Sequence, residues 1–265
     1  MVRRHDEIPT MRALTWLLAA CLLAHPAFAQ SPSVLDAIQQ RGALRVGLTG
    51  DYRPFSLRDP VTGAIEGLDV DVAQEMAAAL GVTLEIVPTA WANLLPDLEA
   101  GKFDLAAGGV SITLDRQKAA FFSIPLMRSG KTPIARCTDA AKYQTLAAID
   151  MPGIRVITNP GGTNERFDRA QLHAADIVVF PANAAIFDEL VAGRADVMLT
   201  DAVETRLQQK LHPELCAIHP DQPFNFSELA YLLPQDVPFQ QWVNQFLHIA
   251  TQTGQYGRLT AKWLN

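Results

Sequence analysis

The sequence is poor in cysteine, histidine and positive charge, and each scarcity excludes a class of function. Its 265 residues include 3 cysteines and 6 histidines, and none of them cluster at the spacing of metal ligands, so we expect no metal. No glycine-rich dinucleotide motif follows a predicted strand and no nucleophile elbow is present, so we expect no cofactor. Only 22 basic residues stand against 28 acidic ones, without a basic stripe. The chain is therefore a poor candidate for binding nucleic acid or an anionic membrane.

Long hydrophobic runs are also scarce, and the one near the N-terminus indicates export. A basic segment ending at Arg12 precedes residues 13–24, which are apolar but for one threonine. This run is too short to cross the roughly 30 Å hydrocarbon core of a membrane. Ala27-Phe28-Ala29 then offers the small-residue pattern that signal peptidase reads. We predict that residues 1–29 are a signal peptide, that the mature chain starts at Gln30 in the periplasm, and that no membrane anchor follows.

Two alternatives remain open for this segment. Leu18-Ala19-Ala20-Cys21 matches the pattern that precedes a lipid-modified cysteine, although the apolar run continues past Cys21. The other alternative is a start at Met11.

Removal of residues 1–29 would leave 19 basic and 26 acidic residues, a net charge of −7. The remaining chain of about 235 residues is long enough for two lobes with a core each.

Cys137 and Cys216 would be the only cysteines of the mature chain. An oxidising compartment allows them to form a disulfide if the fold brings them together, and two buried free thiols are the alternative. We predict the disulfide from the compartment, because spacing alone does not fix geometry.

Strand-like and helix-like segments alternate twice along the chain. The first set comprises strands at residues 44–48, 83–87 and 105–110 and helices at 69–80 and 93–100. The second set comprises strands at residues 154–158, 177–180 and 197–199 and helices at 164–171 and 184–192. Each set is a βαβαβ unit, which requires parallel strands with helices on the faces of the sheet. The sequence therefore predicts an α/β protein with two lobes, each a mainly parallel sheet flanked by helices.

The C-terminal segment does not continue the second unit. A strand at residues 230–233 and helices at 239–251 and 256–263 are expected to dock on the first lobe. The chain would then cross between lobes near residues 131–136 and 224–229, which makes a hinge. The predicted lobes are residues 30–133 with 226–265, and residues 134–225. A cleft where the strand ends of two α/β lobes face each other is the expected ligand site.

Four segments resemble the periplasmic amino-acid-binding proteins of ABC importers. They are Gly50-Asp51-Tyr52-Arg53-Pro54-Phe55, Gly67-Leu68-Asp69-Val70-Asp71, Leu98-Glu99-Ala100-Gly101-Lys102-Phe103-Asp104 and Gly109-Val110-Ser111-Ile112-Thr113-Leu114-Asp115-Arg116. The resemblance covers nearly the whole mature chain. It implies the type II periplasmic binding protein fold and a small carboxylate-bearing molecule bound between the lobes.

Four other segments are more similar to the periplasmic cyclohexadienyl dehydratases. They are Asn159-Pro160-Gly161-Gly162-Thr163-Asn164-Glu165, Gly130-Lys131-Thr132-Pro133-Ile134, Thr200-Asp201-Ala202-Val203-Glu204 and Leu211-His212-Pro213-Glu214-Leu215-Cys216. These enzymes share the binding-protein fold but convert prephenate to phenylpyruvate, or arogenate to phenylalanine, with loss of water and carbon dioxide. The resemblance implies a lyase. A non-catalytic amino-acid receptor of an ABC importer is the alternative.

The resembling motifs supply candidate substrate-binding residues on both sides of the cleft. The planar guanidinium of Arg116 suits a two-point contact with a carboxylate, and the alternative is a surface ion pair with Asp115 or Asp97. Gly162, Thr163 and Asn164 lie where a helix begins, so free N–H groups there attract an anion, with an ordinary N-cap as the alternative. The remaining predicted contacts are Tyr52, Trp91, Gly109, Ser111 and Asp201. For the two aromatic residues among them, packing in the core is the alternative.

Glu204 and Asn159 are the predicted catalytic residues. In amino-acid receptors the aspartate at the position of Asp201 takes the ligand's ammonium group, whereas the position of Glu204 has no such duty. The resembling dehydratases carry their general acid at the position that matches Glu204. They carry an active-site asparagine at the position that matches Asn159, which would orient the substrate or the acid through hydrogen bonds. A carboxyl group that faces a closed cleft is costly unless it is neutral or functional, and a solvated acid in the first helical turn is the alternative. We expect Glu204 to protonate the departing hydroxyl, a step worth on the order of 10² to 10⁴ in rate.

Overall fold

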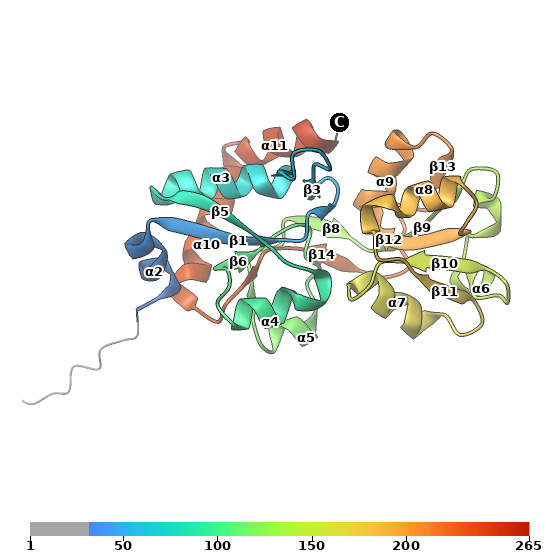
Figure 1. Cartoon of the computed structure of the whole chain (residues 1–265), viewed down its shortest axis with the longest axis horizontal. Helices are drawn as coiled ribbons and strands as arrows, with labels where there is room; N and C mark the ends of the chain where they lie inside the picture. Colours follow the sequence, from blue (N-terminus) through green and yellow to red (C-terminus); the bar gives the residue numbers. More distant parts are fainter. Residues whose placement is uncertain (1–31, 265) are drawn as a thin grey trace, which may run out of the picture. The chain divides into compact units, whose positions relative to one another are not determined.

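Two five-stranded sheets, each with helices on its faces, form the two lobes of the protein (Figure 1). The computed structural model describes residues 32–264, so the predicted signal peptide and Cys21 lie outside the described residues. Both sheets belong to the unit that starts at Ser33. The predicted two-lobed α/β fold is confirmed, whereas the exact residues that divide the lobes stay a prediction.

The first sheet is mixed. Three strands pair in parallel and two join antiparallel, in the order β5 (Thr83–Pro88), β1 (Ala43–Leu48), β6 (Leu105–Ala106), β15 (Leu232–Leu233) and β7 (Phe121–Phe122). The parallel part is the predicted βαβαβ unit. The C-terminal strand β15 docks on this lobe, as expected.

The second sheet repeats this plan. Its order is β11 (Asp176–Val179), β10 (Arg155–Thr158), β12 (Val197–Asp201), β9 (Lys131–Arg136) and β13 (Leu215–Ala217). The first three strands are parallel and β9 is antiparallel to both of its neighbours. In both sheets an antiparallel strand lies beside the three parallel ones. This strand is β9 in the second lobe and β15 in the first, and each is the strand that follows a crossing between the lobes.

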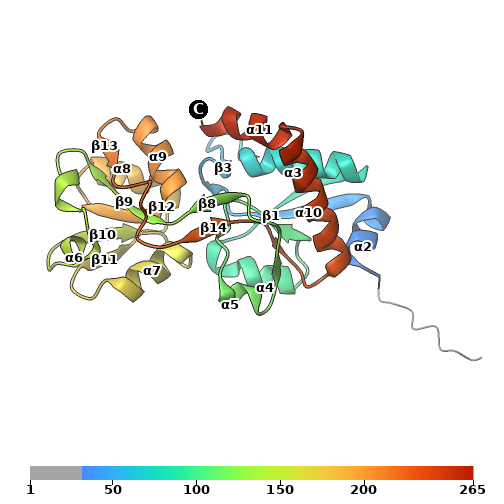
Figure 2. The same cartoon turned by 180° about the vertical axis from the view of Figure 1, so that it is seen from behind.

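The two crossings are the antiparallel pair β8 (Met127–Ser129) and β14 (Ser227–Leu229), which Figure 2 shows between the lobes. The prediction of a crossing at residues 131–136 was wrong, because this segment is strand β9, buried from Lys131 to Ala135 within the second sheet. The crossing predicted at residues 224–229 contains β14. Two strands at the hinge confirm the predicted double crossing.

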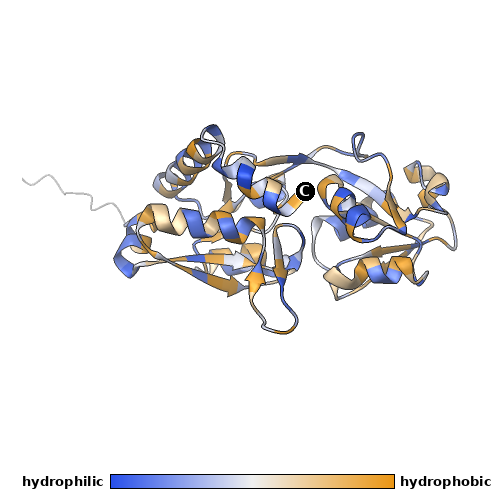
Figure 3. Cartoon of the chain, turned by 90° about the horizontal axis from the view of Figure 1, so that it is seen from above, coloured by the Kyte–Doolittle hydropathy of each residue, from blue (hydrophilic) through white to orange (hydrophobic). Residues whose placement is uncertain are grey.

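Helices cover both faces of each sheet (Figure 1), and Figure 3 shows hydrophobic and hydrophilic residues alternating along them. On α10 (Val237–Gln252), Phe239, Val243 and Leu247 recur every four residues and are buried in the core of the first lobe, as an amphipathic helix requires. The other helices of this lobe are α2 (Val34–Arg41), α3 (Leu68–Leu80), α4 (Leu94–Glu99), α5 (Leu114–Gln117) and α11 (Gln255–Leu264). Those of the second lobe are α6 (Leu146–Ile149), α7 (Thr163–Gln171), α8 (Ile186–Val191) and α9 (Ala202–Leu211).

Strand β12, in the middle of the second sheet, carries its polar residues at its C-terminal end. Val197 and Leu199 pack in one apolar cluster and Met198 in another, because successive side chains point to opposite faces and both faces are covered. The strand ends at Asp201, and α9 begins at the next residue. Without a loop between them, strand and helix fix this edge of the sheet.

Cys137, directly after β9, and Cys216, in β13, are bonded through their sulfur atoms at 2.06 Å, with a Cα–Cα distance of 4.8 Å. Strands β9 and β13 are neighbours in the sheet, so the disulfide ties residues that are 79 positions apart. No helix within residues 32–264 is long and apolar enough to span a membrane.

Candidate functional site

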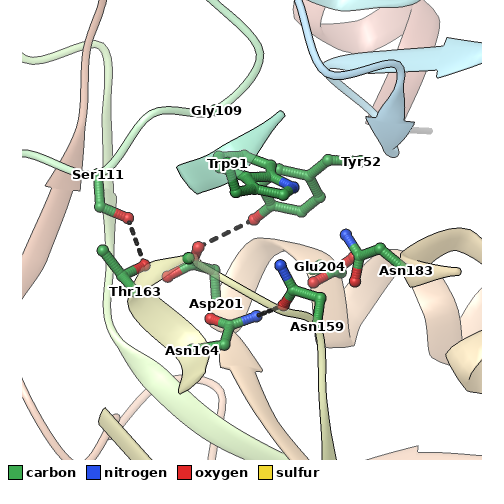
Figure 4. Close-up of a pocket in the computed structure, with 11 residues that line it drawn as sticks. Tyr52, Trp91, Gly109, Ser111, Asn159, Thr163, Asn164, Asn183, Asp201 and Glu204 are labelled. Carbon is green, nitrogen blue, oxygen red and sulfur yellow. Dashed lines mark hydrogen bonds between the residues drawn. The ribbon is translucent and has the colours of Figure 1, made fainter. Parts of the chain in front are cut away.

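A pocket of about 270 Å³ is lined by residues of both lobes (Figure 4). Ten of the predicted site residues line it: Tyr52, Trp91, Gly109 and Ser111 from the first lobe, and Asn159, Gly162, Thr163, Asn164, Asp201 and Glu204 from the second. Asn183 lines it as well and was not predicted, whereas Arg116 lies outside the lining. No group of three or more histidine, cysteine, aspartate and glutamate side chains within residues 32–264 is arranged to hold a metal ion.

Aromatic side chains form the wall from the first lobe. Tyr52 ends the short strand β2 (Asp51–Tyr52), and Trp91 begins a 3₁₀ turn (Trp91–Asn93) after β5. Their ring centroids lie 5.8 Å apart in an edge-to-face arrangement. The Tyr52 hydroxyl donates to Oδ2 of Asp201 at 3.0 Å, which joins the two lobes. Burial, followed by the nearby Asp201 and Glu204 carboxyl groups, raises the pKa of Tyr52 well above its ordinary value, so the hydroxyl keeps its proton.

A glycine turn packs closely against this wall. Gly109 has a φ of +73°, and a Cβ there would lie 2.7 Å from the Tyr52 ring, so a larger residue is both strained and blocked. The carboxylate of Asp69, at the start of α3, accepts hydrogen bonds from the backbone N–H groups of Gly108 and Gly109 at 2.7 and 2.9 Å. This turn ends β6 at Ala106 rather than at the predicted residue 110.

Arg116 lies directly behind the pocket. Its Nη1 donates to the backbone oxygen of Ser111 at 2.8 Å, and the Ser111 hydroxyl lies 3.2 Å from that of Thr163 in the other lobe. Burial, with a smaller contribution from Arg166, lowers the pKa of Arg116 to about 10, so the side chain is charged at neutral pH. Asp115 pairs with Lys118 instead. The role of Arg116 in binding a carboxylate stays a prediction.

The N-cap residue of α7 is Gly162, and no side chain caps the helix, so the alternative of an ordinary N-cap by Thr163 or Asn164 was wrong. The carboxylate of Glu165 accepts from the N–H of Gly161 at 2.7 Å, and this bond, with a neighbouring arginine, lowers the pKa of Glu165. The N–H groups of Gly162, Thr163 and Asn164 meet no protein acceptor in the part of the chain that the structure describes. Such N–H groups at a helix start attract anions.

Lys131 was not predicted to lie near the site. It is 2% exposed, and its ammonium group donates to Oγ1 of Thr163 at 3.1 Å, Oδ1 of Asn164, and Oδ1 of Asp201 at 2.9 Å. These contacts use all three donors of an ammonium group. Since Tyr52 binds the other oxygen, both oxygens of Asp201 are engaged. The available signal was the dehydratase-like segment that contains Lys131.

A chain of hydrogen bonds orients Glu204 from behind. Nδ2 of Asn164 donates to Oδ1 of Asn159 at 3.1 Å and to Oγ1 of Thr200 at 3.0 Å. The hydroxyl of Thr200 donates in turn to Oε2 of Glu204. A hydroxyl has one hydrogen, so Thr200 donates it to Oε2 and accepts the hydrogen bond from Asn164 on its oxygen. Oε1 of Glu204 has no side-chain or backbone partner within residues 32–264 and is the oxygen available to a ligand.

The surroundings of Glu204 favour its neutral form. The residue is 3% exposed, and this burial is the main reason that its pKa rises from 4.5 to about 8. Asp201 and Asp51 raise the pKa further, whereas Thr200 and Lys131 lower it. Glu204 is therefore a carboxylic acid at pH 7 that holds a transferable proton.

A second cavity of about 760 Å³ also reaches Glu204. Both lobes line it, through residues that include Asp51, Arg53, Gln208 and His212. Glu204 therefore borders two spaces: the ligand pocket and a larger opening.

Asn183 begins a 3₁₀ turn (Asn183–Ala185) after β11. It is 5% exposed, and its Nδ2 donates to the backbone oxygen of Asp51 at 3.1 Å, a third hydrogen bond between the lobes. Its Oδ1 is buried and unpaired within the described residues.

Comparisons of the whole chain with known proteins find a matching family and similar proteins. The family model described as bacterial extracellular solute-binding proteins, family 3, matches residues 44–265. A protein of Pseudomonas aeruginosa named cyclohexadienyl dehydratase is 52% identical over 248 residues, which cover 94% of this chain and 92% of that protein. The crystal structure of an ancestral amino acid-binding protein, described as a precursor of cyclohexadienyl dehydratase, matches 88% of this chain and 100% of its own at 36% identity and a TM-score of 0.81. That of an ancestral cyclohexadienyl dehydratase matches 89% of this chain and 98% of its own at 51% identity and a TM-score of 0.56.

Proposed function

The chain belongs to family 3 of the bacterial extracellular solute-binding proteins, and we propose that it is a periplasmic cyclohexadienyl dehydratase. It converts prephenate to phenylpyruvate, arogenate to phenylalanine, or both. The observation that carries the proposal is Glu204, a buried acid that stays neutral at pH 7 and turns one oxygen toward a ligand pocket. A receptor needs no proton donor, and burial of an idle carboxyl group costs free energy. The identity with the Pseudomonas aeruginosa dehydratase supports the same function.

The reaction requires one proton in the right place. Oε1 of Glu204 gives its proton to the ring hydroxyl, and the C–O bond breaks with its electron pair going to the departing water. The bond between the ring and its carboxylate breaks at the same time, and its electron pair completes the aromatic ring while carbon dioxide leaves. Expulsion of hydroxide is thereby avoided, and general acid catalysis of this kind contributes about 10² to 10⁴ in rate.

Each turnover leaves Glu204 ionised, so the residue has to recover a proton. The second cavity gives it an opening separate from the ligand pocket. Arg116 and the start of α7 would hold a substrate carboxylate, and Tyr52 and Trp91 would pack against the ring. Asn159 and Asn164 would keep Thr200, and through it Glu204, in place.

The receptor alternative is weaker at Asp201. Lys131 and Tyr52 already bind one oxygen each of this carboxylate, so a ligand's ammonium group would have to share Asp201 with the like-charged ammonium group of Lys131. The paired Asp201 instead fixes the position of Lys131 and closes the lobes on each other.

Purified protein incubated with prephenate at neutral pH tests the proposal. We expect phenylpyruvate to accumulate with wild-type protein. If no phenylpyruvate or phenylalanine forms from either substrate while the protein binds amino acids tightly, the chain is a receptor. Mass spectrometry tests separately whether the chain is released into the periplasm. It should find a mature N-terminus at Gln30, whereas a diacylated Cys21 would show that the chain carries a lipid anchor instead.

A further inference from the structure

We propose that Asn183 binds the departing hydroxyl of the substrate, accepting its hydrogen on Oδ1 so that an oxygen lone pair faces Glu204. This inference rests on the proposed dehydratase function and adds a substrate-contacting residue to it. The resembling motifs do not include Asn183, so the assignment comes from its contacts alone.

The orientation of the Asn183 amide is fixed by its neighbour. The backbone oxygen of Asp51 only accepts hydrogen bonds, so the group that faces it at 3.1 Å is the Nδ2 donor. Oδ1 must then point elsewhere, and it has no partner within the described residues. A buried carbonyl oxygen without a donor is costly, and Asn183 lines the ligand pocket. A donor on the ligand would satisfy it.

Asn183 and Glu204 lie at the same end of the pocket. Asp51, whose backbone binds Asn183, is close enough to Glu204 to raise its pKa. Ala184, the residue after Asn183, lines the second cavity together with Glu204 and Asp51. Figure 4 shows the Asn183 side chain beside that of Glu204, away from Ser111 and Thr163. A hydroxyl that reaches Oε1 of Glu204 is therefore placed near Oδ1 of Asn183.

Other side-chain acceptors of the pocket are already occupied. Each has a donor or hydroxyl partner within the protein: Asp201 with Tyr52 and Lys131, Asn164 with Lys131, Asn159 with Asn164, and Ser111 with Thr163. Among the side-chain acceptors that line the pocket, Oδ1 of Asn183 is the one without any hydrogen-bond partner in the described residues, beside Oε1 of Glu204, which carries the proton to be donated.

The chemistry of the leaving group requires such an acceptor. A hydroxyl oxygen has one hydrogen and two lone pairs, and it accepts a proton from Glu204 only if a lone pair faces that acid. As the C–O bond breaks, the oxygen keeps the bonding pair, holds its own hydrogen and gains the one from Glu204, and leaves as water. Its original hydrogen becomes more acidic during this transfer, so the bond to Oδ1 strengthens in the transition state. Loss of that bond should lower kcat more than it raises KM.

The primary test is Asn183→Ala, with Asn244→Ala as the control. Asn244 also uses its Oδ1 as an acceptor, for the N–H of Ile124, but lies outside the pocket. We expect Asn183→Ala to lower kcat about 10-fold or more, the loss of one hydrogen bond made in the transition state. Phenylpyruvate has lost the hydroxyl, so its Kd should stay within twofold of wild type, which also shows that the variant is folded. A kcat within twofold of wild type, or an equal loss of phenylpyruvate binding, would overturn the inference.

A second variant separates contact from packing. Asn183→Asp keeps an acceptor but adds a negative charge near Glu204, which already faces Asp201, Lys131 and Asp51. The pKa of Glu204 should rise, so the alkaline limb of the kcat profile should move to higher pH, and Asn183→Ala should not move it upward. An unchanged limb in Asn183→Asp contradicts the placement of Asn183 beside the acid. If wild-type protein forms no product, the dehydratase function fails; if it does and Asn183 variants match it, only this inference fails.

Discussion

The two lobes contribute different chemistry to one pocket. The first lobe supplies ring faces, a glycine turn and the buried Arg116, which suit holding a substrate. The second supplies Lys131, Thr200, Asp201 and Glu204, a buried network with a transferable proton. In the proposed mechanism the reacting groups therefore all come from the second lobe, whereas the binding groups come from both lobes, since the start of α7 also lines the pocket. Substitutions in the two lobes should affect different kinetic constants.

The supporting structure differs in the same way. In the first lobe, Tyr52 ends the two-residue strand β2, and Trp91 begins a 3₁₀ turn after β5. In the second, Asp201 ends β12 and Glu204 lies in the first turn of α9, with no loop between them. Reacting groups on joined regular elements are held more precisely than groups on loops. The comparison thus predicts larger losses of kcat from the second lobe.

Glu204→Gln should cause the largest loss of activity. Glutamine keeps the size and the acceptor for Thr200 but has no transferable proton, so kcat should fall by about 10² to 10⁴. Phenylpyruvate binding should survive, because the proposed contacts to its carboxylate and ring do not include Glu204. Steady-state kinetics and a binding titration measure the two effects.

Glu165→Gln is the matched control for this variant. Glu165 lies at the start of α7 but caps Gly161 and binds Arg169. If Glu165→Gln abolishes turnover while Glu204→Gln keeps it, the general acid has been assigned to the wrong carboxyl group.

The pH dependence should follow from the same group. Activity should be lost as pH rises through the pKa of Glu204, about 8, because only the protonated acid donates. The raised pKa also means that the native state holds a proton between pH 4.5 and 8 that the unfolded chain releases. The contribution of Glu204 to the free energy of unfolding should therefore fall as pH rises through this window. Urea unfolding at pH 5 and pH 8 should show a smaller decrease for Glu204→Gln than for wild type; equal decreases would contradict the raised pKa.

Thr200→Val tests the network that orients the acid. Valine keeps the shape but removes both the donor to Glu204 and the acceptor for Asn164. We expect kcat to fall roughly 10-fold, with the alkaline limb moving to higher pH because the Thr200 bond lowers the pKa of Glu204. Thr205→Val is the control, since the Thr205 hydroxyl is buried in α9, next to Glu204 in the sequence, but binds the backbone oxygen of Ala202. Equal kinetics for both variants would leave Thr200 as a packing residue only.

The sequence predicted the fold better than the network. Periodicity located both βαβαβ units because buried parallel strands and amphipathic helices have distinct patterns. It misplaced one crossing, since Lys131 at the start of β9 looks like a solvent-exposed lysine until the sheet buries it against Asp201. Thr200 lies in a dehydratase-like segment, but nothing in that segment marks it as the partner of Glu204, and Asn183 lies in none of the resembling segments. Their roles depend on partners 36 and 132 residues away, and such distances are not visible in a single sequence.

Arg116→Lys should affect binding rather than chemistry. A lysine keeps the charge but loses the planar two-point contact, so KM should rise about 10-fold with kcat nearly unchanged. Arg258→Lys, on the exposed side of the first lobe, is the like-charge control. An unchanged KM would show that Arg116 only supports Ser111 from behind.

Cys137→Ser combined with Cys216→Ser should have the smallest effect on activity and should change stability instead. The disulfide joins β9 and β13 of the second lobe, and neither cysteine lines the pocket, so kcat and KM should stay within twofold of wild type. A crosslink that spans 79 residues restricts the unfolded chain, which the chain-entropy model values at roughly 4 kcal/mol as an upper estimate. Calorimetry should find a lower Tm for the double variant, and a reducing agent should lower the Tm of wild-type protein to a similar extent. Since the reacting network and the disulfide share the second lobe, this variant asks whether the network needs the crosslink or only the folded sheet. Thiol titration of denatured, unreduced wild-type protein should find no free thiol at Cys137 or Cys216. Two reactive thiols would show that the disulfide does not form, and an unchanged Tm in the double variant would show that it does not stabilise this lobe.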